Sequence, residues 1–145
     1  PDLLNPALIK AVITKESSWN PTAYRGEPAI GDASRGLMQL LYRTAQGMGY
    51  GGSPEGLFDP STNIDLGSQY LAYQMQRYGY PAGVSAYNAG HPITGNASYV
   101  SDVDAYYAWF LTNDPLFQVP PVGGGGDPAP FPRLGAAEWR RRSGR

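Results

Sequence analysis

The sequence of 145 residues contains no cysteine and only one histidine, His91. The absence of cysteine excludes disulfide bonds, catalysis by a thiolate and metal sites built from cysteine. A single histidine cannot form a histidine-rich metal site. We therefore expect no bound metal and no cofactor, while the compartment in which the protein works is left open.

The chain also lacks long hydrophobic runs and a basic body. No segment approaches the roughly 20 consecutive apolar residues that a membrane-spanning helix needs. Residues 1–114 carry six basic and ten acidic side chains, whereas residues 115–145 carry five basic and two acidic ones. Binding to nucleic acid needs a basic surface. We therefore expect no membrane span and no nucleic-acid partner.

The residue composition of the sequence changes after residue 114. Residues 120–126 are all proline, valine or glycine, and such a stretch has too few apolar side chains to fold alone. We predict a folded domain over residues 1–114, followed by a Pro/Gly-rich linker and a basic tail over 115–145. No signal peptide is recognisable in the first residues. We expect a domain of a larger polypeptide that is monomeric in isolation.

One stretch near the N-terminus carries the most informative pattern. Residues 7–19 read as a helix, with Asn5 as the N-cap and Pro6 in the first turn, where proline is tolerated. Aliphatic side chains form a stripe at helical spacing up to Ile13, and three residues further on the stripe leads to Glu16. A carboxylate therefore ends the buried face of this helix.

The position of Glu16 predicts an unusual carboxylate. Partial burial and the negative end of the helix dipole both favour its protonated form, so we expect a pKa above the ordinary value of about 4.3. A raised pKa suits a general acid that works near neutral pH. The alternative, from spacing alone, is a glutamate at the rim of the helix that points into water.

The rest of residues 1–114 reads as mainly helical. Residues 20–36 are rich in glycine and proline and are expected to form a loop. The sequence does not decide whether this loop contains a small β-hairpin. Asp59 is the expected N-cap of the longest helix, and Gly67 within that helix indicates the close crossing of another helix. The expected helices cover residues 7–19, 37–45, 60–78, 81–90 and 97–111.

Four short motifs lie in order along this helical frame. They are Glu16-Ser17-Ser18-Trp19-Asn20-Pro21, Gly36-Leu37-Met38-Gln39-Leu40, Asp59-Pro60 with Asn63-Ile64 and Gly67, and Ala86-Tyr87-Asn88-Ala89-Gly90. Each motif is weak alone, but together they resemble the soluble lytic transglycosylase (SLT) domain family over roughly residues 5–111. The resemblance implies a mainly α, lysozyme-like fold around a saccharide groove, and cleavage of bacterial peptidoglycan.

The resemblance also assigns roles to residues at matching positions. Glu16 matches the single catalytic acid of the family. The substrate-binding residues implied in the same way are Ser17, Met38, Gln39, Tyr87, Asn88 and Tyr99. Tyr99 matches a tyrosine that hydrogen-bonds the catalytic carboxyl, although its local motif is thin.

One acid is enough for the implied reaction. Most glycosidases place two carboxylates beside the bond, whereas in a transglycosylase the attacking group belongs to the substrate. Glu16 is expected to protonate the bridging oxygen between N-acetylmuramic acid and N-acetylglucosamine, and then to accept the proton of the muramyl C6 hydroxyl as this group attacks. An intramolecular nucleophile is already held near its target. The product is a 1,6-anhydromuramyl end.

Two features depart from the common pattern of the family. Residues 31–35 lengthen the loop between Glu16 and Gln39, and Tyr42 stands where a proline is frequent. The longer loop is similar to that of transglycosylase domains in secretion systems and phage virions, including tail tape-measure proteins. We expect action in the periplasm or cell wall, with delivery by a virion or by a larger secreted protein.

The other acids leave two alternatives open. Asp59 is better explained as a helix cap. Asp32, which we expect to face solvent, would supply a second carboxylate if it approached the cleft, and the chain would then be a lysozyme-type hydrolase of the same bond. The other alternative is a non-catalytic peptidoglycan-binding or virion structural module that kept the fold.

Overall fold

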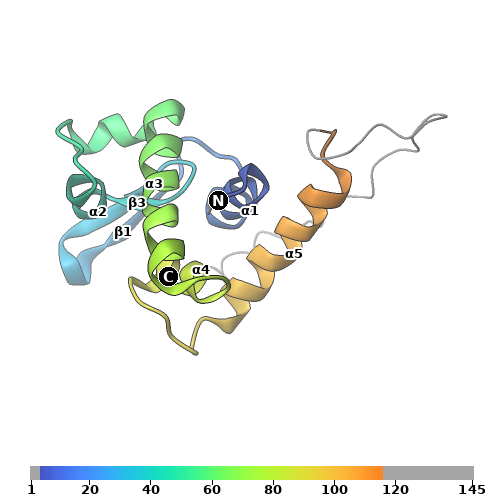
Figure 1. Cartoon of the computed structure of the whole chain (residues 1–145). Helices are drawn as coiled ribbons and strands as arrows, with labels where there is room; N and C mark the ends of the chain where they lie inside the picture. The colour runs from blue at the N-terminus through green and yellow to red at the C-terminus, as the bar shows by residue number, and fades with distance from the viewer. Residues whose placement is uncertain (1–3, 116–145) are drawn as a thin grey trace.

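The computed structural model describes residues 4–115. In that range the fold consists mainly of α-helices with a small three-stranded antiparallel sheet (Figure 1). In chain order the elements are α1 (Pro6–Ser17), β1 (Tyr24–Glu27), η1 (Pro28–Ile30), β2 (Asp32–Arg35), β3 (Leu40–Leu41), α2 (Tyr42–Gly47), η2 (Pro54–Phe58), α3 (Pro60–Tyr78), α4 (Ala82–Ala89) and α5 (Ala97–Asn113). The mainly α prediction is confirmed. The predicted linker and tail lie, apart from residue 115, outside the described residues.

The first helix forms as its sequence predicts but ends two residues early. The Asn5 side chain accepts a hydrogen bond from the Ala7 amide at 2.8 Å, and Pro6 lies in the first turn. Ser18 and Trp19 have φ angles of 50° and 66°, so the helix stops at Ser17 instead of continuing to Trp19. α1 then packs mainly against α5, on the side of the molecule away from the sheet (Figure 1).

The loop after α1 contains the hairpin that the sequence left open. β1 pairs with β2 in an antiparallel register that sets Glu27 opposite Asp32. Gly31, next to η1, closes the hairpin with a φ of 64°, which glycine adopts without strain. β3 joins the other edge of β2, with Leu41 opposite Ser34.

The prediction of one helix over residues 37–45 is wrong. Gly36 and Gln39 have φ angles of 79° and 52°, which turn the chain after β2, and Leu40–Leu41 then pair with that strand. The helix α2 begins only at Tyr42. A short leucine-rich run fits a buried strand as well as a helix, and the pairing with β2 decided between them.

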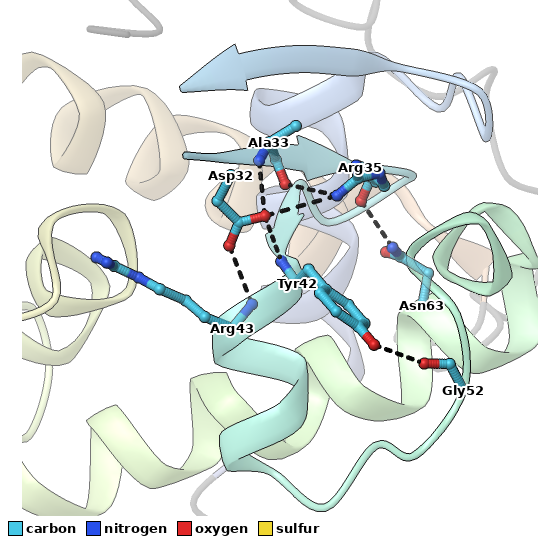
Figure 2. A network of polar contacts seen from close by, with 7 residues as sticks. All are labelled: Asp32, Ala33, Arg35, Tyr42, Arg43, Gly52 and Asn63. Atoms are coloured by element: carbon cyan, nitrogen blue, oxygen red, sulfur yellow. Dashed lines mark hydrogen bonds and ion pairs between the residues drawn. The ribbon is translucent and has the colours of Figure 1, made fainter. Parts of the chain in front are cut away.

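The N-terminus of α2 is capped by a side chain from β2. Asp32 accepts hydrogen bonds from the amides of Tyr42 at 3.2 Å and Arg43 at 3.0 Å, the first two residues of α2 (Figure 2). It also accepts one from the Ala33 amide at 2.7 Å, and the Arg35 guanidinium lies 3.6 Å from the same carboxylate. This carboxylate therefore joins the sheet to the helix.

The long helix α3 begins at its predicted cap and passes close to the turn between β2 and β3. Asp59 accepts hydrogen bonds from the amide and hydroxyl of Thr62 at 2.9 and 2.8 Å, and both bonds hold the pKa of Asp59 below its usual range. A Cβ added to Gly67 would lie 2.5 Å from the Met38 sulfur. The close approach at Gly67 is therefore made by this turn, and the expectation of another helix there is corrected.

The main hydrophobic core joins α1, α3, α4 and α5, and a smaller cluster that contains Ala45 and Leu57 joins α2 and η2. The main core also contains Met38, which comes from the turn between β2 and β3 and not from a helix. None of the helices within residues 4–115 is both long and apolar enough to cross a membrane.

Candidate active site

Glu16 lies in the last turn of α1 with only 3% of its surface exposed. The Tyr99 hydroxyl, from α5, donates a hydrogen bond to Glu16 Oε2 at 3.1 Å. Tyr99 is itself buried, with 2% exposed. Glu16 is therefore a buried carboxyl held by a distant phenol, and the alternative of a rim residue in water is excluded by its burial. The catalytic role of Glu16 remains a prediction.

The turn that carries Met38 and Gln39 is held by hydrogen bonds to three other segments of the chain. The Gln39 side-chain amide donates to the Ala23 carbonyl at 3.0 Å, just before β1. The Asn63 side chain, from α3, accepts a hydrogen bond from the Met38 amide at 2.7 Å. The Tyr87 hydroxyl, from α4, donates to the Met38 carbonyl at 2.7 Å. The second, third and fourth sequence motifs therefore meet in space at this turn.

Two of the expected substrate-binding side chains point into the protein. Met38 has no exposed surface, because the turn directs its side chain into the core beside Gly67, so the expectation that Met38 lines the groove is corrected. Ser17 is 5% exposed, and its hydroxyl donates to the Ile13 carbonyl of its own helix at 3.1 Å.

Three other expected residues meet along a groove between the sheet and α4. The groove has a volume of about 270 Å³; Gln39 lines its sheet side, and Tyr87 and Asn88 line its α4 side. The Asn88 side-chain oxygen accepts a hydrogen bond from the Asn96 amide at 3.0 Å, which orients it. Tyr87 also belongs to the main core cluster, which contains Tyr99 as well.

Sequence reasoning missed two charged residues of this groove, Glu27 and Arg43. Glu27 ends β1, and its carboxylate lies 3.9 Å from the Arg25 guanidinium. Arg43 is the second residue of α2. Neither residue belongs to one of the four motifs, and only the correct positions of the hairpin and of α2 would have placed them in the groove.

Asp32 is bound by backbone amides, and the expectation that it faces solvent is wrong. Its side chain is 10% exposed, and both oxygens accept backbone N–H groups (Figure 2). Burial by itself raises the pKa of Asp32, but the amides of Arg43, Ala33 and Tyr42 and the Arg35 guanidinium outweigh that effect and hold the pKa below its usual range. An ionised, capping carboxylate of this kind is a poor candidate for a second catalytic group.

Backbone strain is concentrated in the first and second sequence motifs. Among the described residues other than glycine, Ser18, Trp19 and Gln39 have positive φ angles. Such conformations cost on the order of 1–3 kcal/mol each and gather at functional sites. Hydrogen bonds hold two of them in place, because the Trp19 indole donates to the Thr14 hydroxyl at 2.9 Å and Gln39 donates to Ala23.

A small sheet beside a mainly helical core, with a buried glutamate at the end of a helix, is the arrangement expected of a lysozyme-like fold. The sequence profile of the Transglycosylase SLT domain family matches residues 2–107. The chain belongs to this family.

Curated and structural relatives agree with this assignment. The soluble lytic murein transglycosylase of Escherichia coli (strain K12) is 30% identical over an alignment of 167 positions, which covers 91% of this chain and 22% of that protein. Membrane-bound lytic murein transglycosylase C of Actinobacillus pleuropneumoniae serotype 5b (strain L20) is 36% identical over 121 residues, which cover 72% of this chain and 31% of that protein. The crystal structure of the 70 kDa soluble lytic transglycosylase SLT70 from Escherichia coli superimposes with a TM-score of 0.62 at 29% identity, covering 80% of this chain and 24% of that chain. The chain therefore spans less than a third of the length of these relatives.

Proposed function

We propose that the chain is a peptidoglycan lytic transglycosylase that cleaves the β-1,4 bond between N-acetylmuramic acid and N-acetylglucosamine. The observation that carries the proposal is the buried Glu16 carboxyl, hydrogen-bonded by Tyr99, in a chain of the SLT family. Burial disfavours the charged form of a carboxyl, and this suits a group that must first donate a proton.

In the proposed reaction Glu16 acts first as acid and then as base. It protonates the bridging oxygen, and positive charge develops on the muramyl ring as the bond breaks. The carboxylate left behind keeps the hydrogen bond from Tyr99, which stabilises its negative charge. Glu16 then accepts the proton of the C6 hydroxyl as that oxygen attacks C1 of the same sugar. No water is consumed, and the new end is 1,6-anhydromuramic acid.

The hydrogen bonds that Asp32 accepts from backbone amides support transglycosylation over hydrolysis. A hydrolase that inverts configuration needs a second carboxylate about 6.5–9.5 Å from the first to activate water, whereas an attacking group within the substrate needs none. Asp32, the acid that the sequence left open for this role, caps α2 through its amide bonds.

A lysozyme-type hydrolase of the same bond is the second candidate, and Glu27 is the observation that favours it. Glu27 lines the groove, and 29% of its side chain is exposed. It could therefore meet a water molecule in the groove, although Glu16 would remain the acid in either reaction.

Mass spectrometry of the fragments released from purified peptidoglycan distinguishes these functions. We expect anhydro-muropeptides, which are lighter by one water than hydrolysed ones. Glu16→Gln should abolish release and leave the circular dichroism spectrum unchanged, whereas Glu55→Gln, at an exposed acid outside the groove, is the matched control and should keep full activity.

Two other results would replace the proposal. Hydrolysed ends that disappear in Glu27→Gln would establish the hydrolase. No fragments from the folded wild-type chain, together with binding to peptidoglycan, would establish a non-catalytic module.

The proposed substrate sets the place of action. Peptidoglycan lies in the periplasm or cell wall, so we propose that the domain acts there as part of a longer polypeptide, in line with the greater length of its relatives. Delivery by a phage virion stays a prediction from the lengthened loop between Glu16 and Gln39.

A further inference from the structure

The residue before Glu16 forms a buried ion pair. The Lys15 side chain has no exposed surface, and its Nζ lies 2.9 Å from Asp102 Oδ2, on a side chain that is 8% exposed. Asp102 follows Tyr99 by three residues on α5, so both side chains lie on one face of that helix. One face of α5 therefore binds two consecutive residues of α1.

Stability alone does not account for this pair. Removing two charges from water costs about as much free energy as their attraction returns, and a well-packed apolar pair is often equally stable. Misalignment, in contrast, would leave a buried charge without its partner. A slide of α5 by one turn would move Asp102 about 5.4 Å along the helix axis, so the pair strongly favours one alignment of α5 on α1.

Other contacts in this part of the core are less demanding of position. Ala11 and Val12 of α1 and Val103 and Phe110 of α5 belong to one apolar cluster, and apolar packing tolerates small rearrangements better than a buried charge tolerates separation. The ion pair also lies near Tyr99, which donates the hydrogen bond to Glu16. Lys15 Nζ lies 6.0 Å from the centroid of the Tyr99 ring, a distance at which a cation is attracted to an aromatic face.

We propose that Lys15 and Asp102 are positioning residues for the catalytic acid. Their ion pair holds α5 in the alignment that keeps the Tyr99 hydroxyl within hydrogen-bond distance of Glu16. Neither residue lines the groove between the sheet and α4, so they act through Tyr99 and not on the substrate. The inference rests on the proposed function of Glu16, but the geometry that it describes can be measured without activity.

The first test replaces both charges by apolar groups of similar size. In Lys15→Met/Asp102→Leu we expect a folded protein, an unchanged KM for a soluble peptidoglycan fragment and a kcat at least about tenfold lower, since small displacements of a catalytic group are costly to rate. The matched control is Lys10→Met/Asp114→Asn, which removes the 2.5 Å ion pair between α1 and the C-terminal end of α5. We expect the control to keep the wild-type kcat.

A cycle with Tyr99→Phe tests the route of the effect. If the ion pair acts through the tyrosine hydroxyl, Lys15→Met/Asp102→Leu should cause almost no further loss of kcat when it is added to Tyr99→Phe. An unchanged kcat in Lys15→Met/Asp102→Leu, a loss that appears in KM instead, or an equal loss in both backgrounds would overturn the proposal.

A spectroscopic readout separates this proposal from the proposed function. The ¹³C chemical shift of the Glu16 carboxyl should change in Lys15→Met/Asp102→Leu and in Tyr99→Phe, and should stay unchanged in Lys10→Met/Asp114→Asn. Unchanged shifts in the charge-free variant would refute positioning. If the shifts change as expected but the wild-type chain releases no fragments, the proposed function fails and the positioning of Glu16 stands.

Discussion

At the scale of single residues, the carboxylates differ in what their oxygens contact. Asp32 and Asp59 accept backbone amides at the starts of α2 and α3, and Asp102 accepts an ammonium group. Glu16 accepts a tyrosine hydroxyl inside the core, and Glu27 lines the groove. Among these five carboxylates, Glu16 and Glu27 neither cap a helix nor form a buried ion pair, and they are the two with a proposed part in chemistry.

Replacement of Asp32 should lower stability in a pH-dependent manner. We expect Asp32→Ala to lower the free energy of unfolding by about 1–2 kcal/mol at pH 7, the loss typical of a capping side chain. The folded protein holds the pKa of Asp32 below its usual value. Its contribution is therefore complete above the unfolded-state pKa of about 3.9 and is lost as the pH falls through the folded-state pKa.

Urea unfolding at about pH 7 and about pH 2.5 checks this prediction. The difference in the free energy of unfolding between wild type and Asp32→Ala should be smaller at the lower pH. Asp65→Ala, at an exposed position in α3, is the control and should differ little from wild type at either pH. A difference for Asp32→Ala that does not depend on pH would show that the carboxylate charge is not the cause.

At the scale of elements, the turn between β2 and β3 connects the parts of the candidate site. Its backbone is bound by Asn63 of α3 and Tyr87 of α4, and Gln39 within it binds the chain before β1. The side chain of Met38 fills the space above Gly67. Displacement of this one turn would therefore disturb both sides of the groove.

A methyl group at Gly67 should displace the turn. The added Cβ would lie 2.5 Å from the Met38 sulfur and 2.8 Å from the Met38 Cβ, so Met38 must shift. We expect Gly67→Ala to lower the free energy of unfolding by about 1–3 kcal/mol and to lower peptidoglycan cleavage even at temperatures where the variant is folded. Thermal unfolding and fragment release check the two effects.

The matched control for Gly67 is Gly47, the last residue of α2, where an added Cβ meets nothing within 4 Å. Gly47→Ala should leave both stability and cleavage near wild type, or raise stability slightly because alanine has less freedom in the unfolded chain. Equal behaviour of the two variants would contradict the steric explanation.

At the scale of the whole molecule, residues 4–115 contain a shared core and the candidate site. The main core joins helices from both ends of that part, since α1 packs against α5. The chain nevertheless spans only 22% of the soluble lytic murein transglycosylase of Escherichia coli. The predicted folding unit, residues 1–114, stays a prediction.

A shortened chain tests the predicted boundary. We expect residues 1–114 alone to unfold in one cooperative transition, at a temperature close to that of the 145-residue chain, and to release the same fragments from peptidoglycan. Calorimetry and mass spectrometry of the two chains check this. Loss of the transition, or of fragment release, would place residues 115–145 inside the functional unit.

The sequence by itself determined the features that depend on neighbouring residues. The cap of α1 at Asn5 and the cap of α3 at Asp59 follow from local hydrogen bonding, and both are present in the structure. Helical periodicity indicated a partly buried Glu16 but left a rim position open, and the structure buries this side chain. The order of the four motifs also indicated the family, which the match over residues 2–107 confirms.

Only the tertiary structure decided the features that depend on segments far apart in the chain. The strand β3 in place of a helix, the capping of α2 by Asp32, the burial of Met38 and the presence of Glu27 in the groove all arise from such contacts. Local preferences in these segments are nearly balanced, so packing and pairing with distant residues determined their conformation.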